Sequence, residues 1–99
     1  MRFDEKKVLV TGASRGIGRA IALLFAGAGA QVAVHYQSNL EAAQATLAEL
    51  PGTGHILCAG DVADPDAVQQ LIANAISELG GIDILVNNCL LYTSDAADE

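Results

Sequence analysis

The chain has few cysteines, few basic residues and no long apolar run, and each shortage excludes a class of protein. Its 99 residues include two cysteines, too few for a disulfide framework or a cysteine-based metal site. Twelve acidic residues against five lysines and arginines give a net charge of −7, which provides no basic surface for a nucleic-acid backbone. No apolar segment approaches the roughly 18 residues of a membrane span, and the charged amino terminus does not resemble a secretion signal. The composition therefore predicts a cytoplasmic protein that binds neither nucleic acid nor membrane.

Short apolar runs and helical patterns alternate between Lys7 and Asn88. The runs at residues 8–10, 31–34, 55–59 and 82–86 predict strands, and an amphipathic pattern follows each of the first three. Such an alternation is typical of parallel strands joined by right-handed crossovers. The sequence therefore predicts an α/β fold, a Rossmann-like doubly wound parallel sheet. About four strands and three helices, the N-terminal part of such a domain, are present.

Each expected helix carries its own signals. Ser38 with Glu41 three residues later predicts a capping box at the start of the second helix. Asp64 followed by Pro65 predicts the start of the third. The apolar faces are expected at Ile17, Ile21, Leu24, Phe25 and Ala28 in the first helix, Leu40, Ala43, Leu47 and Leu50 in the second, and Val68, Leu71, Ile72, Ala75 and Leu79 in the third.

The most informative segment joins the first strand to the first helix. It has the sequence Lys7 to Gly18, KVLVTGASRGIG, with glycines at 12, 16 and 18. The first backbone N–H groups of a helix are unpaired and lie at its positive end, so they attract phosphate. Gly12 would form the tight turn, Gly16 would let the backbone approach a pyrophosphate, and Gly18 would let the helix pack closely on the strand. An ordinary glycine-rich loop is the alternative.

The expected sheet brings distant segments to one edge. With the strand order 3-2-1-4, the carboxyl ends of the strands place residues 12–18, 36–39, Asp61 and Asn88 along one rim. His35 and His55 are interpreted as strand residues rather than ligands. The sequence therefore predicts a dinucleotide site at this rim.

Three motifs together resemble the short-chain dehydrogenase/reductase family: the segment TGASRGIG from Thr11 to Gly18, the pair Asp61-Val62 and the pair Asn87-Asn88. The resemblance covers residues 6–88 and implies NAD(P)-dependent hydride transfer between a nicotinamide and an alcohol or carbonyl substrate. It further implies that Asp61 holds the adenine amino group, that the Val62 N–H meets a ring nitrogen and that Asn88 lies near the cofactor ribose. Asn87 would brace the central strands. Alternatively, Asp61 only terminates a strand and the asparagines only form a turn.

Cofactor choice depends on the end of the second strand, where NAD-specific sites carry an acidic residue. Tyr36 occupies this position, and the next acid, Glu41, is explained by capping. Arg15, together with Ser38 and Asn39, could hold an adenosine 2′-phosphate through charge-assisted hydrogen bonds. NADP(H) is therefore expected rather than NAD(H), with a solvated Arg15 as the alternative. The expected coenzyme-binding residues are Gly12, Ser14, Arg15, Gly16, Ile17, Gly18, Tyr36, Ser38, Asn39, Asp61, Val62 and Asn88.

Residues 89–99 do not continue the pattern. This segment, CLLYTSDAADE, resembles the translation of a transposase-type sequencing adapter, so we expect residues 1–88 to be a partial NAD(P)-binding domain and 89–99 a non-native tail. A genuine short polar tail is the alternative. The family's usual Asn-Asn-Ala-Gly is interrupted at Cys89.

The resemblance places a catalytic Ser and a Tyr-x-x-x-Lys beyond this interruption. Tyr92 is followed four residues later by Ala96 rather than a lysine, so the chain as given is expected to be inactive. The resemblance implies a small-molecule substrate and a homo-oligomeric intact protein, but the sequence identifies neither the substrate nor the oligomeric state. A non-catalytic dinucleotide sensor or partner-binding module on the same fold is the alternative function. The DNA downstream of codon 88 would distinguish the two.

Overall fold

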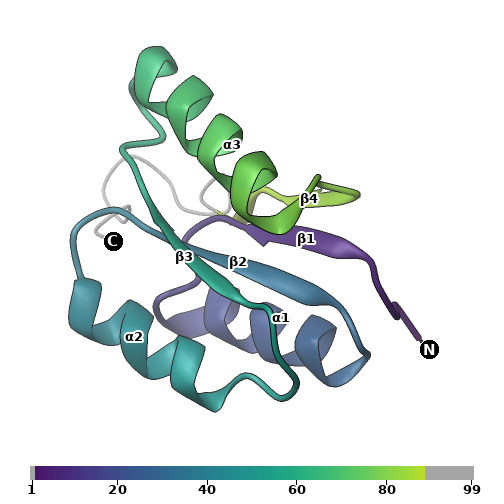
Figure 1. The fold of residues 1–99 in the computed structure, drawn as a ribbon. Helices are drawn as coiled ribbons and strands as arrows, with labels where there is room; N and C mark the ends of the chain where they lie inside the picture. Colours follow the sequence, from purple (N-terminus) through teal and green to yellow (C-terminus); the bar gives the residue numbers. More distant parts are fainter. Residues whose placement is uncertain (1, 89–99) are drawn as a thin grey trace.

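The computed structural model describes residues 2–88, which form a parallel sheet covered by helices on both faces (Figure 1). The expected non-native tail, residues 89–99, lies outside the described residues. The elements are β1 (Lys7–Val10), α1 (Gly16–Gly27), β2 (Gln31–Tyr36), α2 (Leu40–Glu49), β3 (Ile56–Ala59), α3 (Pro65–Leu79) and β4 (Ile84–Val86). The strand order is β3-β2-β1-β4, and every described pair is parallel, so the predicted topology is confirmed. None of the helices described is long and apolar enough to cross a bilayer.

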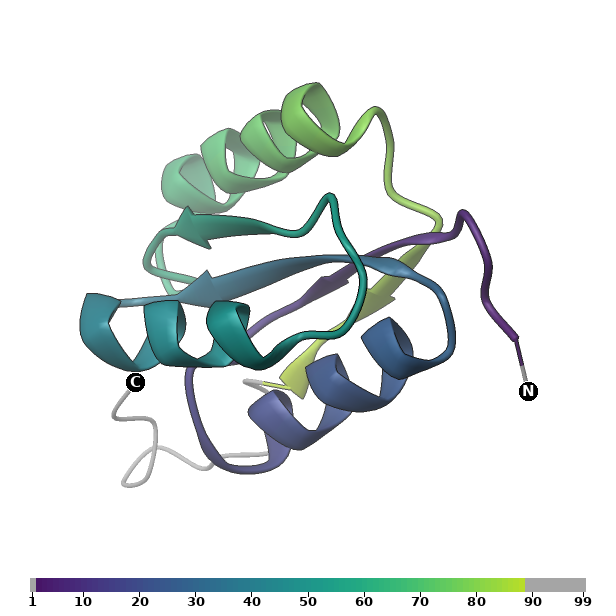
Figure 2. The ribbon, with the colours of Figure 1, turned by 60° about the horizontal axis from the view of Figure 1, so that its bottom comes forward.

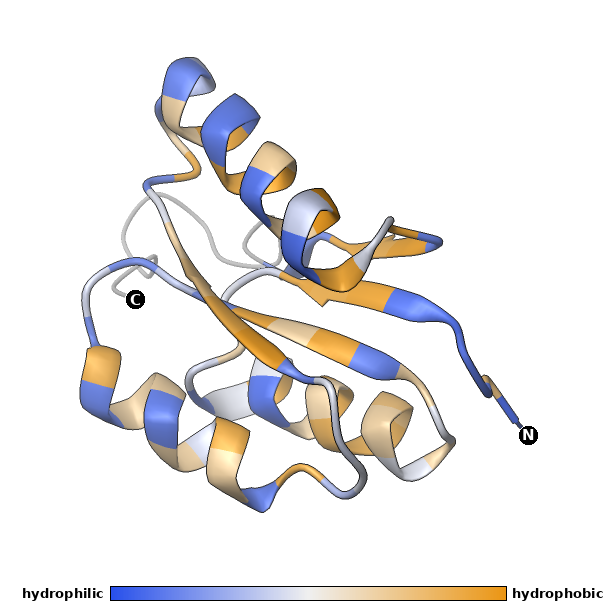
Figure 3. Ribbon diagram, in the orientation of Figure 1, coloured by the Kyte–Doolittle hydropathy of each residue, from blue (hydrophilic) through white to orange (hydrophobic). Residues whose placement is uncertain are grey.

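The sheet separates two apolar layers. Figure 2 shows α1 and α2 on one face and α3 on the other. Successive side chains of a strand point to opposite faces, so Val8 and Val10 join the α1 and α2 layer whereas Leu9 joins the α3 layer. All three side chains are fully buried. Strands covered on both faces are expected to be mostly apolar, and Figure 3 shows largely hydrophobic strands, with hydrophilic residues at the amino ends of β1 and β2.

The buried face of α1 differs from the prediction. Its buried residues are Gly18, Ala22 and Ala26, spaced four apart, while Ile17 and Leu24 are 55% and 74% exposed. Small residues at this spacing let the helix axis lie close to the strands, and the larger apolar residues are consequently turned to the flank. The predicted stripe of large residues is therefore wrong for Ile17 and Leu24, although Ile21 and Phe25 are partly buried against the core.

The start of α2 also differs from the predicted capping box. The N-cap is Asn39, whose Oδ1 accepts a hydrogen bond from the Ala42 N–H at 3.0 Å. Because the helix begins at Leu40, Ala42 rather than Glu41 occupies the third helical position, so Ser38 and Glu41 do not form a capping box. Leu40 is 44% exposed, and Thr46 is buried instead.

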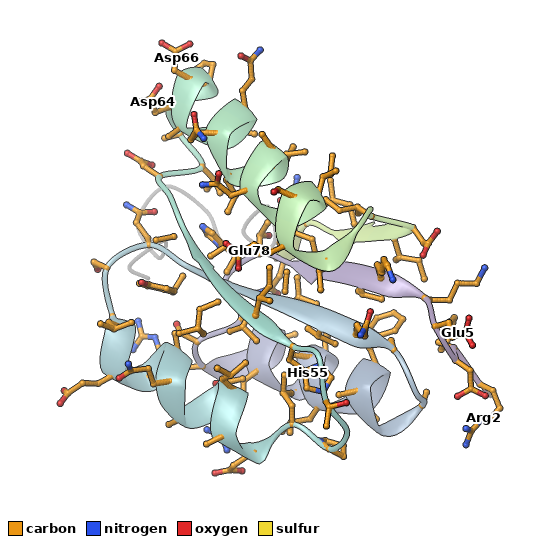
Figure 4. All side chains as sticks on the ribbon, in the orientation of Figure 1. Arg2, Glu5, His55, Asp64, Asp66 and Glu78 are labelled. Carbon is orange, nitrogen blue, oxygen red and sulfur yellow. The ribbon has the colours of Figure 1, made fainter. Side chains whose placement is uncertain are left out.

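The start of α3 confirms the prediction. Asp64 is the N-cap and accepts a hydrogen bond from the Asp66 N–H at 3.0 Å, with Pro65 next to it (Figure 4). The helix ends at Gly80 in the left-handed conformation, φ 91°. Its buried residues are Leu71, Ala75 and Leu79, which belong to the predicted stripe.

We expect Asp64→Ala to lower the free energy of unfolding by about 1 kcal/mol, because it leaves a first-turn amide of α3 without an acceptor. Asp64→Asn keeps a capping oxygen and should cost only a few tenths of a kcal/mol. Urea titrations of both variants make the comparison. Equal losses in the two variants would mean that charge, not capping, is what Asp64 contributes.

The thiol of Cys58 is buried on β3 beneath α3. Burial, with a smaller contribution from the charge of Glu78, raises its pKa from 9.0 to about 12. Because the thiolate is the reactive form, the folded protein should be alkylated at Cys58 far more slowly at pH 8 than the unfolded chain. In the unfolded chain this thiol ionises first, so its contribution to stability should fall as the pH rises above about 9. Alkylation of the Cys58 peptide measured with and without urea tests this; equal rates would contradict it.

Candidate functional site

The predicted rim exists at the carboxyl ends of the strands. β1, β2 and β4 end at Val10, Tyr36 and Val86, and parallel pairing places these ends at the same edge. The glycine turn after β1 is bonded to both neighbouring strands, by Thr11 N–H to the Val86 carbonyl at 3.0 Å and by Ala13 N–H to the His35 carbonyl at 2.8 Å. The structure therefore brings together the segments that the sequence predicts at this site.

The turn itself requires glycine at two positions. Gly12 and Gly16 have φ values of 61° and 64°, a conformation that side chains disfavour. The Thr46 hydroxyl, from α2, donates to the Ser14 carbonyl at 2.9 Å. Ser14 is buried, and this bond ties its carbonyl, and hence the turn, to α2.

Gly18 allows the first turn of α1 to lie against the glycine turn. A Cβ placed at Gly18 would overlap the Gly12 carbonyl oxygen and come within 2.7 Å of Asn88 Nδ2. The same Nδ2 donates to that Gly12 oxygen at 3.2 Å. Because Gly18 has no side chain, the first turn of α1 can pack against the turn that follows β1 and against Asn88, which follows β4.

The amino end of α1 is not capped as the other described helices are. Asn39 and Asp64 accept hydrogen bonds from first-turn amides of α2 and α3, and each of those helices has an acidic residue in its first turn. In α1 the side chain of the N-cap, Arg15, makes no capping hydrogen bond, and the first turn has no acidic residue. With no side-chain cap and no acid in its first turn, the positive end of the α1 dipole is suited to an external anion.

The residues after β2 carry no acid before α2. Tyr36 is half-buried, and Ser38, Asn39 and Arg15 are exposed. Asn39 Oδ1 is already engaged as the cap of α2. Arg15 places a positive charge at this part of the rim.

Asp61 and Val62 follow β3 at the same rim. Asp61 Oδ1 accepts from the Ala63 N–H at 2.9 Å, so the carboxylate shapes the loop, and its side chain is exposed. Val62 lines a cavity of about 380 Å³ together with Thr11 and Asn87. A second hollow, of about 450 Å³, lies among residues that include Glu5, Lys7 and Gln31, and no predicted site residue lines it.

The two asparagines after β4 have different environments. Asn87 is exposed, and its Oδ1 lies 3.4 Å from the Thr11 hydroxyl, a contact that links the ends of β4 and β1. Asn88 is 1% exposed and bonded to Gly12 through Nδ2, while its Oδ1 has no partner among the described residues. Through its bond to the Gly12 carbonyl, Asn88 holds the glycine turn in place.

Sequence reasoning missed two residues that shape the rim, His35 and Thr46. Both are fully buried polar side chains, and both bond the glycine turn. A polar residue inside an apolar strand, as in QVAVHY, is the signal that could have revealed His35. Thr46 gives no comparable signal because threonine is common on exposed helix faces.

Comparison with known proteins points to one family. The model of the short chain dehydrogenase family matches residues 6–98. Glucose 1-dehydrogenase from Gluconobacter oxydans is 47% identical over 89 residues, which cover 88% of this chain and 34% of that protein. The chain spans about a third of the length of the curated relatives it matches.

Two solved structures similar to this chain contain nicotinamide coenzymes. A Burkholderia cenocepacia protein with bound NADP is 33% identical with a TM-score of 0.78, over 87% of this chain and 34% of that one. A 7α-hydroxysteroid dehydrogenase in complex with NADH is 41% identical with a TM-score of 0.77, over the same 87% and 34%. Both coenzymes thus occur among the relatives.

Proposed function

The chain belongs to the short chain dehydrogenase family, and from this premise we propose that residues 6–88 form the coenzyme-binding part of an NAD(P)-dependent oxidoreductase. The supporting observation is the amino end of α1, which has no side-chain cap and no acid in its first turn and lies behind a glycine turn that other elements hold in place. The backbone amides of Gly16, Ile17 and Gly18 would bind the coenzyme pyrophosphate there. Asn88 would support this pyrophosphate site indirectly, by holding Gly12 in place through its hydrogen bond to the Gly12 carbonyl.

The adenosine half would lie along the rim toward β3. Asp61 would accept a hydrogen bond from the adenine amino group, and the Val62 N–H would donate to a ring nitrogen. Asp61 is exposed, and only one of its oxygens is needed for the loop bond to Ala63. This arrangement uses the end of β3, two strands away from β1 in the sheet.

We propose NADP(H) as the preferred coenzyme. Tyr36 stands where NAD-specific sites carry an acid that would repel a 2′-phosphate. Arg15 is exposed beside Gly16, and Ser38 and Asn39 supply further polar groups at the end of β2. A guanidinium suits a phosphate because its donors match the phosphate oxygens in geometry and charge.

The bound nicotinamide would supply hydride exchange with an alcohol or carbonyl substrate. The family's proton-transferring pair is a Tyr-x-x-x-Lys, but Tyr36 and Tyr92 are followed four residues later by Leu40 and Ala96. We therefore propose that these 99 residues do not catalyse the reaction, and that the complete reading frame encodes the catalytic Ser and Tyr-x-x-x-Lys. Its product, the full-length protein, would act on a small molecule in the cytoplasm as a homo-oligomer.

An assay of the full-length protein tests the oxidoreductase proposal. NADPH oxidation would be followed with a panel of ketones, aldehydes and sugars, and NADP reduction with the matching alcohols. We expect turnover with at least one substrate pair, and none for the 99-residue chain. Tight coenzyme binding by a full-length protein without Ser and Tyr-x-x-x-Lys, and without turnover, would instead identify a dinucleotide sensor.

A further inference from the structure

We infer, on the basis of the proposed function, that His35 is a positioning residue that fixes the distance between the two coenzyme-binding loops. Its side chain is fully buried on β2. Nδ1 accepts a hydrogen bond from the Gly12 N–H at 2.9 Å, and Nε2 lies 2.7 Å from the Gly60 carbonyl oxygen. One imidazole therefore connects the turn before α1 to the loop that leads into Asp61 and Val62.

The two bonds determine the state of the ring. A backbone amide can only donate and a carbonyl can only accept, so Nδ1 must be unprotonated and Nε2 must carry the hydrogen. The neutral Nε2–H tautomer satisfies both loops at once. Protonation at Nδ1 would place two donors against each other at Gly12.

The position of β2 explains why one side chain can serve both loops. β2 lies between β1 and β3 in the sheet, and His35 is the penultimate residue of the strand. Thr46 and Asn88 bond the glycine turn at Ser14 and Gly12, and these contacts define the turn itself. His35 adds a bond to Gly60, and hence to the loop proposed to hold adenine.

This bridge matters for a ligand that spans both loops. A dinucleotide would place its pyrophosphate at the amino end of α1 and its adenine near Asp61 and Val62. Without the imidazole, the Gly12 N–H and the Gly60 carbonyl would lose their partners, and the loops would shift to solvate them. A ligand that contacts only one loop would be much less affected.

The test compares coenzyme affinity in variants of the full-length protein. His35→Leu removes both bonds, whereas His35→Asn keeps an acceptor that can reach the Gly12 amide but not Gly60. The matched control is Val32→Ala, at a fully buried position of the same strand that packs in the core. NADPH and adenosine affinities would be measured by calorimetry at a temperature where each variant is folded by circular dichroism.

We expect His35→Leu to weaken NADPH binding by roughly 10- to 100-fold, His35→Asn to weaken it less, and adenosine affinity to change little in either. Val32→Ala should lower the melting temperature and leave NADPH affinity unchanged. If His35→Leu does not fold, His35→Asn against Val32→Ala decides the question. The inference is overturned if NADPH affinity is unchanged in the folded His35 variants, or if it falls equally for NADPH and adenosine.

Two controls complete the test. If the unsubstituted full-length protein does not bind NADPH, the proposed function fails rather than the role of His35. In that protein, long-range ¹⁵N–¹H correlation should show His35 as the neutral Nε2–H tautomer. A hydrogen on Nδ1 would overturn the bridge independently of any variant.

Discussion

Gly18→Ala is expected to weaken NADPH binding by the full-length protein by at least roughly 100-fold, because the new methyl overlaps the backbone at the centre of the site. The added Cβ meets the Gly12 carbonyl oxygen and lies 2.7 Å from Asn88 Nδ2. Backbone cannot swing aside as a flexible side chain does, so α1 must move away from the glycine turn. Calorimetric titration with NADPH measures the loss, and urea unfolding should show a decrease in stability of about 1–3 kcal/mol.

Gly27→Ala is the matched control for this substitution. Gly27 ends the same helix, and a Cβ there would meet nothing closer than Pro51 Cγ at 4.0 Å. We expect unchanged NADPH affinity and a small gain in stability, of up to about 1 kcal/mol, since alanine favours the helix. NADPH binding by Gly18→Ala at the level of Gly27→Ala would contradict the proposed approach of α1 to the pyrophosphate.

Arg15→Ala is expected to reverse the coenzyme preference. Loss of a charge-assisted hydrogen bond to the 2′-phosphate should weaken NADPH binding by roughly 10- to 100-fold per bond. NADH affinity should change little because NADH lacks that phosphate. Titrations of the full-length protein with both coenzymes, repeated at several salt concentrations, measure the ratio.

Arg2→Ala removes the same charge from a distant site. Arg2 is exposed before β1, away from the carboxyl ends of the strands, and is paired with Asp4 (Figure 4). It should leave the ratio of NADPH to NADH affinity unchanged. If Arg15→Ala behaves as Arg2→Ala does, Arg15 is a solvated loop arginine and the NADP(H) preference has another origin.

The strand order and the position of the rim were predictable from sequence because they depend on repeated local signals. The glycine turn and the alternation of apolar runs define parallel crossovers, and the order 3-2-1-4 is confirmed. The N-cap at Asp64 was also predictable. Proline is favoured at the first position of a helix, and it keeps the residue before it in an extended, non-helical conformation.

Helix faces were less predictable because hydrophobicity does not report closeness of packing. The apolar stripe of α1 included Ile17 and Leu24, yet the helix approaches the sheet through Gly18, Ala22 and Ala26. A stripe of small residues contributes little to a hydrophobic pattern, although it determines the distance between helix and sheet. The N-cap of α2 is Asn39 rather than the predicted Ser38. The two could not be told apart from sequence, because serine and asparagine are both favourable N-caps.

The hydrogen bonds that hold the glycine turn in place were the least predictable, although Asn88 itself was an expected site residue. Thr46 and Asn88 act through backbone carbonyls of Ser14 and Gly12, and His35 acts through backbone groups of Gly12 and Gly60. A local pattern can mark a polar residue such as His35 as unusual, but the partner it bonds depends on the tertiary position of main-chain atoms.

The most direct test of the anion site at α1 is an NMR titration of the ¹⁵N-labelled full-length protein with NADPH. We predict saturable chemical-shift changes that are largest at the amides of Gly12, Gly16, Ile17 and Gly18, followed by those of Asp61 and Val62. Absence of saturable changes, or changes confined to other parts of the molecule, would contradict coenzyme binding at the amino end of this helix.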